Sequence, residues 1–151
     1  MDPSAVKQLD QPRTALRPVD ADDPGAFNHC FAEVNGIRMH YVDEGQGPLV
    51  ILLHGFPYLW YAWRRQIVAL AQAGFRVVVP DQRGFGQTDR PDSIEAYDIS
   101  QSVGDMVGLM AALGERSALI IMFGSSRTRA GSFAACNIWN GSSPTERATS
   151  A

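Results

Sequence analysis

Long apolar runs, basic clusters and cysteine motifs are all scarce in this chain of 151 residues. No window approaches about eighteen uninterrupted apolar residues, and residues 1–25 contain no apolar core of a signal peptide, so we expect no membrane partner and no secretion. The formal charge of -3, with no basic run, argues against a face that binds phosphate backbones and therefore against a nucleic-acid partner. We expect a cytoplasmic protein without an anchor.

Metal and cofactor sites also find little support in the sequence. Cys30 and Cys136 are far apart and form no C-x-x-C pair, which favours idle thiols over a redox centre or disulfide. His29, His40 and His54 have no companion ligands at the spacing of a zinc site. We therefore expect no metal and no cofactor.

Composition divides the chain into three parts. Prolines at positions 3, 12, 18 and 24 predict that residues 1–26 form a flexible arm. Residues 27–122 carry regular apolar patterns and predict one compact domain with its own core. From residue 123 to 151 about half of the residues are Ser, Thr, Gly or Asn, and no apolar period persists beyond residues 133–136. We expect this last part to be a divergent, disordered tail.

The patterns in the middle part predict alternating strands and helices. In chain order they are a hairpin of strands 31–34 and 37–42 around Asn35-Gly36, a strand at 49–53, a helix at 60–73, a strand at 76–80, a helix at 99–113 and a strand at 117–122. Asp98 is the expected N-cap of the second helix. The side chains expected on its core face are Ile99, Val103, Met106, Val107 and Met110.

This order predicts an α/β fold, in which an antiparallel amino-terminal hairpin joins parallel strands with right-handed crossover helices. Ligands of such sheets bind at the carboxyl ends of the strands. Residues 54–57, residues 81–86 and whatever follows Met122 should therefore lie along one rim.

The two motifs on this rim stand in the order of a known family. The sequence His54-Gly55-Phe56-Pro57 follows the third strand, and Asp81-Gln82-Arg83-Gly84-Phe85-Gly86 follows the fourth. We refer to these segments as the HGFP loop (residues 54–57) and the DQRGFG loop (residues 81–86). With the residues between them they resemble the α/β-hydrolase fold, and more narrowly its epoxide hydrolase branch, with haloalkane dehalogenases as near relatives. The resemblance covers residues 27–122, which correspond to the amino-terminal part of the hydrolase core.

The resemblance implies a reaction and a role for the HGFP loop. In the family a nucleophilic aspartate opens a small-molecule epoxide to an ester intermediate, and a water activated by histidine releases the diol. The family aims the backbone N–H at the Phe56 position toward the oxyanion and gives Trp60 a place in the pocket. Gly55 permits close approach of the backbone, and Pro57 can follow a cis bond. His54 belongs to the same loop, and the alternative is a plain strand-to-loop turn.

The DQRGFG loop favours a structural role. We expect Asp81 and Arg83 to tie the loop to its neighbours by ionic hydrogen bonds, while Gly84 and Gly86 supply permissive backbone. A nucleotide site is excluded, because the third glycine of G-x-G-x-x-G is missing.

The family pattern breaks after the strand at 117–122. Where the family has G-x-Asp-x-G, this chain reads Gly124-Ser125-Ser126-Arg127-Thr128 and lacks the aspartate. No histidine occurs after His54, although the mechanism needs one downstream of its nucleophile. We therefore expect the chain to be a truncated, inactive hydrolase that lacks nucleophile, acid and base, with a sheet edge open to self-association.

Three alternatives stay open. The first is a non-catalytic binding or regulatory half-domain that pairs with a full-length relative. The second is a fragment similar to a haloalkane dehalogenase. The third is an unusual serine hydrolase that uses Ser126, although the closing glycine of its motif is replaced by Thr128.

A frameshift, a splice difference or a truncated gene near codon 122 would explain the break. We expect the nucleotide sequence beyond that codon to encode G-x-Asp-x-G and a later histidine in another frame. Reading all three frames checks this, and their absence from every frame would reject the explanation.

Overall fold

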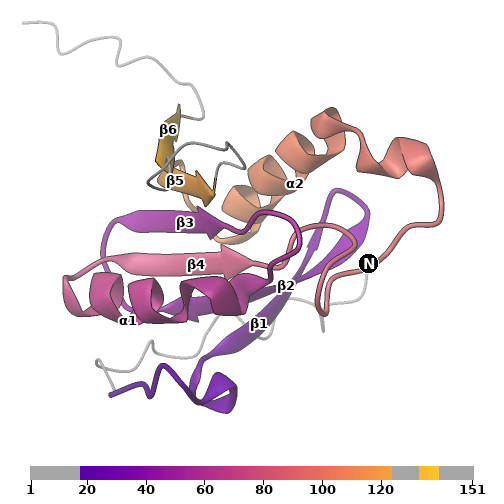
Figure 1. Ribbon diagram of the computed structural model, residues 1–151. Helices are drawn as coiled ribbons and strands as arrows, with labels where there is room; N and C mark the ends of the chain where they lie inside the picture. Colours follow the sequence, from indigo (N-terminus) through magenta and orange to yellow (C-terminus); the bar gives the residue numbers. More distant parts are fainter. Residues whose placement is uncertain (1–17, 124–132, 140–151) are drawn as a thin grey trace, which may run out of the picture.

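The computed structural model describes residues 18–123 and 133–139, which form one six-stranded mixed sheet with helices on its faces (Figure 1). The strands are β1 (His29–Val34), β2 (Ile37–Glu44), β3 (Leu49–Leu53), β4 (Arg76–Pro80), β5 (Ser117–Phe123) and β6 (Phe133–Trp139). The α-helices are α1 (Arg64–Gln72) and α2 (Ile99–Ala112), and the short 3₁₀ helices are η2 (Pro24–Ala26), η3 (Trp60–Trp63) and η4 (Ile94–Tyr97). None of the helices in these ranges could cross a membrane.

The expected hairpin is present at the amino-terminal side of the sheet. Its turn residues Asn35 and Gly36 have φ of 44° and 77°, the pair of positive values that a two-residue type I′ turn requires. The resulting register places Phe31 opposite His40. Because side chains alternate along a strand, His29, Phe31 and His40 lie on one face of the hairpin.

The centre of the sheet is parallel, which confirms the predicted α/β arrangement. The strand order is β1-β2-β4-β3-β5-β6, with β4 antiparallel to β2 and β3 parallel to both β4 and β5. Every residue of β3 and β4 is buried, as expected for strands covered on both faces. The carboxyl ends of β3, β4 and β5 therefore meet at one rim.

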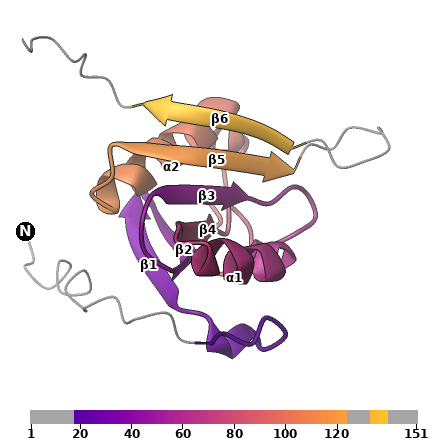
Figure 2. The same cartoon turned by 90° about the vertical axis from the view of Figure 1, so that its left-hand side faces the viewer.

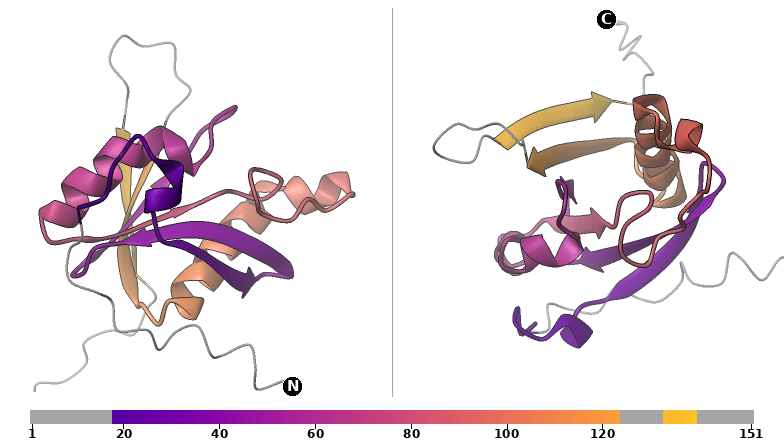
Figure 3. Two further views of the ribbon diagram at one scale, coloured as in Figure 1. Left: turned by 90° about the horizontal axis from the view of Figure 1, so that it is seen from below. Right: turned by 45° about the vertical axis from the view of Figure 1, so that its right-hand side comes forward.

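The two helices cover opposite faces of the sheet (Figure 3). On one face, α1 and η3 pack through Trp60, Trp63, Ile67 and Ala71 against Val42, Val50, Leu52, Val77 and Val79. On the other face, α2 packs through Met106, Leu109, Met110 and Leu113 against residues of the sheet that include Val34, Met39, Ile51, Val78 and Ile120. Burial of these apolar side chains drives the assembly of both layers.

The core face predicted for α2 is wrong in part. Met106 and Met110 are buried, but Ile99, Val103 and Val107 are 76%, 54% and 44% exposed. Leu109, which was not predicted, is fully buried in their place. The helix carries apolar residues on two faces, and periodicity alone does not decide which face meets the sheet. The predicted cap is confirmed, because the Asp98 side chain accepts a hydrogen bond from the Ser100 amide at 2.8 Å.

The carboxyl-terminal part of the chain also departs from expectation. Residues 133–139 were expected in a disordered tail, but they form β6, which pairs antiparallel with β5 (Figure 2). The outer edge of β5, which we expected to be open, is therefore paired with β6. Residues 1–17, 124–132 and 140–151, which include most of the predicted arm and tail, lie outside the described residues. The boundaries of the three predicted parts stay a prediction.

The two faces of α2 can be compared with two matched substitutions. Leu109→Ala should lower the free energy of unfolding by about 2–5 kcal/mol, because it leaves a cavity under a fully buried side chain. Val107→Ala, at a half-exposed position of the same helix, should change it by less than about 1 kcal/mol. Urea denaturation followed by circular dichroism measures both, and equal losses would contradict the assigned face.

Candidate functional site

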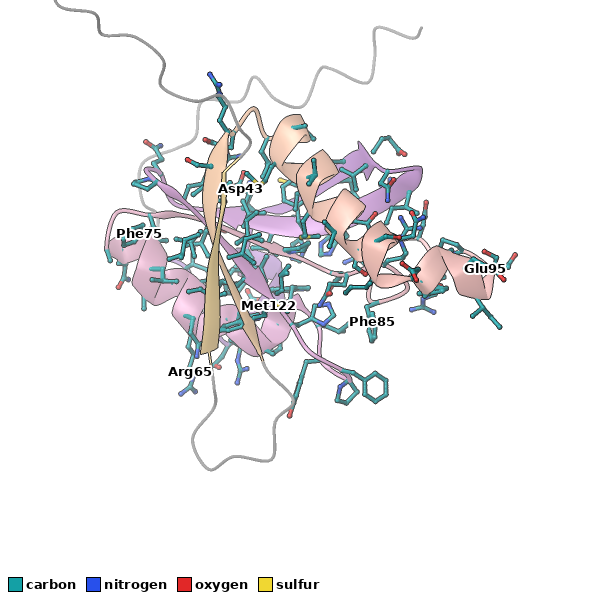
Figure 4. All side chains as sticks on the ribbon, turned by 90° about the horizontal axis from the view of Figure 1, so that it is seen from above. Asp43, Arg65, Phe75, Phe85, Glu95 and Met122 are labelled. Atoms are coloured by element: carbon teal, nitrogen blue, oxygen red, sulfur yellow. The ribbon has the colours of Figure 1, made fainter. Side chains whose placement is uncertain are left out.

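The HGFP loop and the DQRGFG loop lie side by side where β3 and β4 end. The backbone N–H of Gln82 donates to His54 Nε2 at 3.0 Å, and the Gln82 side-chain amide donates to the His54 carbonyl. The Phe85 ring contacts the rings of His54 and Phe56, with centroids 5.2 and 6.3 Å apart. Phe85 lies at the end of the sheet from which the loop after β3 projects, whereas Asp43 lies toward the opposite end (Figure 4). Each loop therefore fixes the position of the other.

His54 is a neutral, structural side chain in this arrangement. Its Nε2 accepts the Gln82 N–H, so the ring proton lies on Nδ1, which faces the Gly55 carbonyl at 3.3 Å. Burial lowers the pKa of His54 below its ordinary 6.5, while the Gly55 carbonyl and the charge of Asp81 act in the opposite direction. The buried imidazole thus connects the two loops without carrying a charge.

Phe56 lies at the turn of the HGFP loop. The Phe56-Pro57 peptide bond is cis, and a hydrogen bond of 2.8 Å from the Tyr58 amide to the Gly55 carbonyl closes the turn. The Phe56 side chain is 83% exposed. Within the described ranges, no residue accepts a hydrogen bond from the Phe56 amide. The loop therefore presents the Phe56 amide as a backbone donor at the carboxyl end of β3.

Asp81 is the polar centre of the rim and is only 1% exposed. One carboxylate oxygen accepts the Trp60 amide at 3.0 Å, and the other faces His40 Nδ1 at 2.8 Å and the Gln87 amide at 3.3 Å. Burial of the carboxyl opposes ionisation, but these hydrogen bonds outweigh it and hold the pKa of Asp81 below its ordinary 3.8. Asp81 is thus an ionised carboxylate that joins three segments of the chain.

The glycines of the DQRGFG loop allow it to fold around this carboxylate. Gly84 and Gly86 have φ of 83° and 51°. A Cβ atom at Gly86 would overlap the Asp81 carboxylate, so glycine is required there for space as well as for backbone conformation.

Arg83 ties the same loop to α2 and to the hairpin. Its guanidinium donates to both carboxylate oxygens of Asp105, at 2.9 and 2.6 Å, and to the Asn35 carbonyl at 3.3 Å. The Asn35 side chain in turn donates to Asp105 at 2.9 Å. Arg83 and Asp105 are both buried, so this bidentate ion pair attaches the DQRGFG loop to α2 in the protein interior.

Trp60 follows the HGFP loop and is also buried. Its ring packs edge-on against Phe27 and His29, each with centroids 5.1 Å away, in the core layer on the α1 side. Its amide is the group that reaches Asp81. The place in a substrate pocket that the resemblance implies for Trp60 stays a prediction.

The partners of Asp81 and Arg83 were not predicted from the sequence. His40 was considered only as a metal ligand, and its ring instead bridges Asp81 and His29, with 2.8 Å between His40 Nε2 and His29 Nδ1. The Asn35-Gly36 turn held the signal, because it fixes the register that makes His29 and His40 diagonal neighbours. Nothing in the sequence marked Asp105 as the partner of Arg83.

The described residues hold no complete reaction centre. Met122 pairs with Leu53 in the sheet, so β5 ends at the same rim as β3, but Ser126 lies outside the described residues. No group of three or more His, Cys, Asp or Glu side chains in the described part is arranged to hold a metal ion. What the rim offers chemically is a backbone donor, a neutral imidazole and a buried carboxylate.

Comparison with known proteins gives consistent matches. The model of the α/β hydrolase fold family matches residues 48–126, which are just over half of the chain. Epoxide hydrolase 1 of Siraitia grosvenorii is 49% identical over 88 residues, which make up 58% of this chain and 28% of that protein. Epoxide hydrolase A of Mycobacterium tuberculosis is 48% identical over 97 residues, which make up 63% of this chain and 30% of that protein.

A solved structure supports the same relationship. The crystal structure of an epoxide hydrolase from Vigna radiata superimposes with a TM-score of 0.63 at 48% identity and covers 64% of this chain and 32% of that one. The chain therefore spans about a third or less of the length of the relatives it matches. The aligned part is their amino-terminal core region, which is epoxide hydrolase-like in this chain.

The neutral state of His54 predicts how it titrates. In the unfolded chain the ring takes up a proton near its ordinary pKa of 6.5, whereas the folded chain resists protonation until a lower pH. His54 should therefore reduce stability as the pH falls below 6.5 toward the lower pKa of the folded state, because the unfolded state binds more protons in that window.

Nuclear magnetic resonance of the imidazole carbon-bound protons measures this pKa, and the His54→Gln variant assigns the resonance. The same variant should lose less stability on acidification than the natural chain. A His54 resonance that titrates at or above 6.5 would contradict the neutral assignment.

Proposed function

Because this chain belongs to the α/β-hydrolase fold family, we propose that its rim is the oxyanion-binding side of an epoxide hydrolase active site. The substrate class is a small-molecule epoxide, as the names of the relatives state for those proteins. The observation that carries the proposal is the Phe56 amide, which lies at the carboxyl end of β3 and is bonded to no described residue. The HGFP loop is held in place by the hydrogen bond from Gln82 to His54 and by the contact of Phe85 with Phe56.

A fixed backbone donor suits the charge that develops in this reaction. When a carboxylate nucleophile has opened an epoxide, attack of water on the carbonyl carbon of the resulting ester places negative charge on the carbonyl oxygen. A donor that is already oriented stabilises that oxygen without reorganisation, and loss of one such donor costs about 10²–10³-fold in kcat. The neutral His54 and the cis Phe56-Pro57 bond belong to the framework that aims the Phe56 amide.

The residues that would perform the covalent steps are not among the 151 in this sequence. No G-x-Asp-x-G follows β5, and no histidine follows His54. We therefore propose that these 151 residues by themselves carry the oxyanion side of the site and do not turn over an epoxide.

A turnover assay of the chain tests its inactivity. We expect no hydrolysis of a panel of epoxides, haloalkanes and esters above the level of the Ser126→Ala variant. Turnover by the natural chain that the Ser126→Ala variant lacks would replace this proposal with a serine hydrolase.

A chimera tests the oxyanion role independently. Residues 48–122 of this chain would replace the aligned segment of the Mycobacterium tuberculosis epoxide hydrolase A, whose own remaining residues complete the protein. The chimera should hydrolyse epoxide. Phe56→Pro, which removes the amide N–H, should lower kcat by about 10²–10³-fold, whereas Phe56→Ala, which keeps it, should lower kcat by less than about tenfold.

Circular dichroism of each chimera controls for folding. Equal activity of the folded Phe56→Pro and Phe56→Ala chimeras would contradict the role of the amide.

A second candidate function is a non-catalytic half-domain that pairs with a full-length relative or with itself. The exposed face of α2, formed by Ile99, Val103 and Val107, favours it, because a helix that is apolar on two sides is usually covered on both. Co-purification with a full-length relative discriminates the two. A stable stoichiometric complex that the Val103→Lys variant disrupts would support pairing, and a monomer in both cases would reject it.

A further inference from the structure

A continuous line of hydrogen bonds runs from the amino-terminal segment to the HGFP loop and is not explained by the oxyanion role. It starts at the Pro24 carbonyl, which lies 3.0 Å from His29 Nε2. His29 Nδ1 lies 2.8 Å from His40 Nε2, and His40 Nδ1 lies 2.8 Å from a carboxylate oxygen of Asp81. The other Asp81 oxygen accepts the amide of Trp60, three residues beyond the HGFP loop.

The number of protons in this line follows from its bonds. The Pro24 carbonyl can only accept, and each of the three contacts that involve a ring nitrogen needs one proton. Two neutral imidazole rings carry one proton each and together supply two. The line formed by His29, His40 and Asp81 therefore holds one proton more than two neutral rings and a carboxylate would hold.

The position of the extra proton follows from burial and charge. His40 is fully buried and directly faces the ionised Asp81, so a positive His40 ring neutralises a carboxylate that would otherwise be buried without a counter-charge. His29 is half-buried, and its Nδ1 then acts as the acceptor for His40. The third proton lies between the two rings.

The described side chains around the His29 and His40 rings are mostly uncharged. On one side the Trp60 ring lies edge-on to His29, and on another Phe31 contacts His40 and carries the Arg38 guanidinium on its face, 3.7 Å from the ring centroid. The neutral His54 lies beyond Asp81 and senses its charge. Among the described residues that pack against the pair, Asp81 is thus the charged group in direct contact.

We propose that His29 and His40 share three ring protons, and that the resulting positive charge on His40 makes it a positioning residue that holds Asp81 against the Trp60 amide. The segment that follows the HGFP loop is thereby held, through the Trp60 amide, by the charge-assisted hydrogen bond between His40 and Asp81. This assignment does not depend on whether the HGFP loop serves an oxyanion.

The proton count can be read directly in the 151-residue chain. Long-range ¹H–¹⁵N correlation of the imidazole nitrogens, recorded near neutral pH, distinguishes protonated from unprotonated ring nitrogens. His54 is an internal control, because its contacts require one ring proton and it is one of only three histidines in the chain. We expect three protonated nitrogens on the His29 and His40 pair and one on His54. Two protonated nitrogens on the pair would overturn the proposal.

The positioning role has its own readout in the exchange of the Trp60 amide with solvent. His40→Asn keeps an N–H donor for Asp81 but cannot hold a charge, so Trp60 exchange should accelerate by about tenfold, the difference between a charge-assisted and a neutral hydrogen bond. The amide of Val79, a fully buried β4 residue, reports global stability.

Equal acceleration of the Trp60 and Val79 amides, or no acceleration of Trp60, would reject the positioning role. If His40→Asn does not fold, His29→Gln at the half-buried position gives the same test with a smaller expected acceleration. An unchanged Trp60 amide in that variant would equally count against the proposal.

Discussion

The carboxylate of Asp81 is the interaction on which the rim of this protein depends. A buried carboxylate is costly unless its oxygens are hydrogen-bonded, and here the partners come from three separate segments: His40 from β2, Trp60 from η3 and Gln87 from the loop after β4. Satisfying one buried group therefore fixes the relative positions of these segments. The HGFP loop lies between β3 and η3 and is constrained at both ends.

The contacts that hold the two loops in place are separate from the residues that would carry out catalysis. The contacts that hold the HGFP loop and the DQRGFG loop in place run to residues between His29 and Asp105, all of which precede β5. None of them involves a nucleophile or a catalytic base. The oxyanion side that we propose for the rim is therefore built from residues that precede β5, while α2 still presents a second apolar face to the outside.

The sequence predicted the elements of this fold better than the contacts between them. Local signals were sufficient for the Asn35-Gly36 hairpin and the Asp98 cap, because each depends on neighbouring residues. The buried face of α2 was misassigned because two apolar faces compete in its sequence, and β6 was missed because its short apolar pattern depends on pairing with β5. The pairing of Arg83 with Asp105 depends on tertiary packing, which no local pattern encodes.

The most direct test of this account is the ¹H–¹⁵N amide correlation spectrum of the Asp81→Asn variant. The substitution preserves the size of the side chain but removes its charge and one acceptor oxygen. If Asp81 organises the rim, the amide signals of Trp60, Gln82 and Gln87 should shift or broaden, while those of β3 and β5 stay in place. Loop amide signals that keep their original positions would contradict the claim that this carboxylate holds the two loops together.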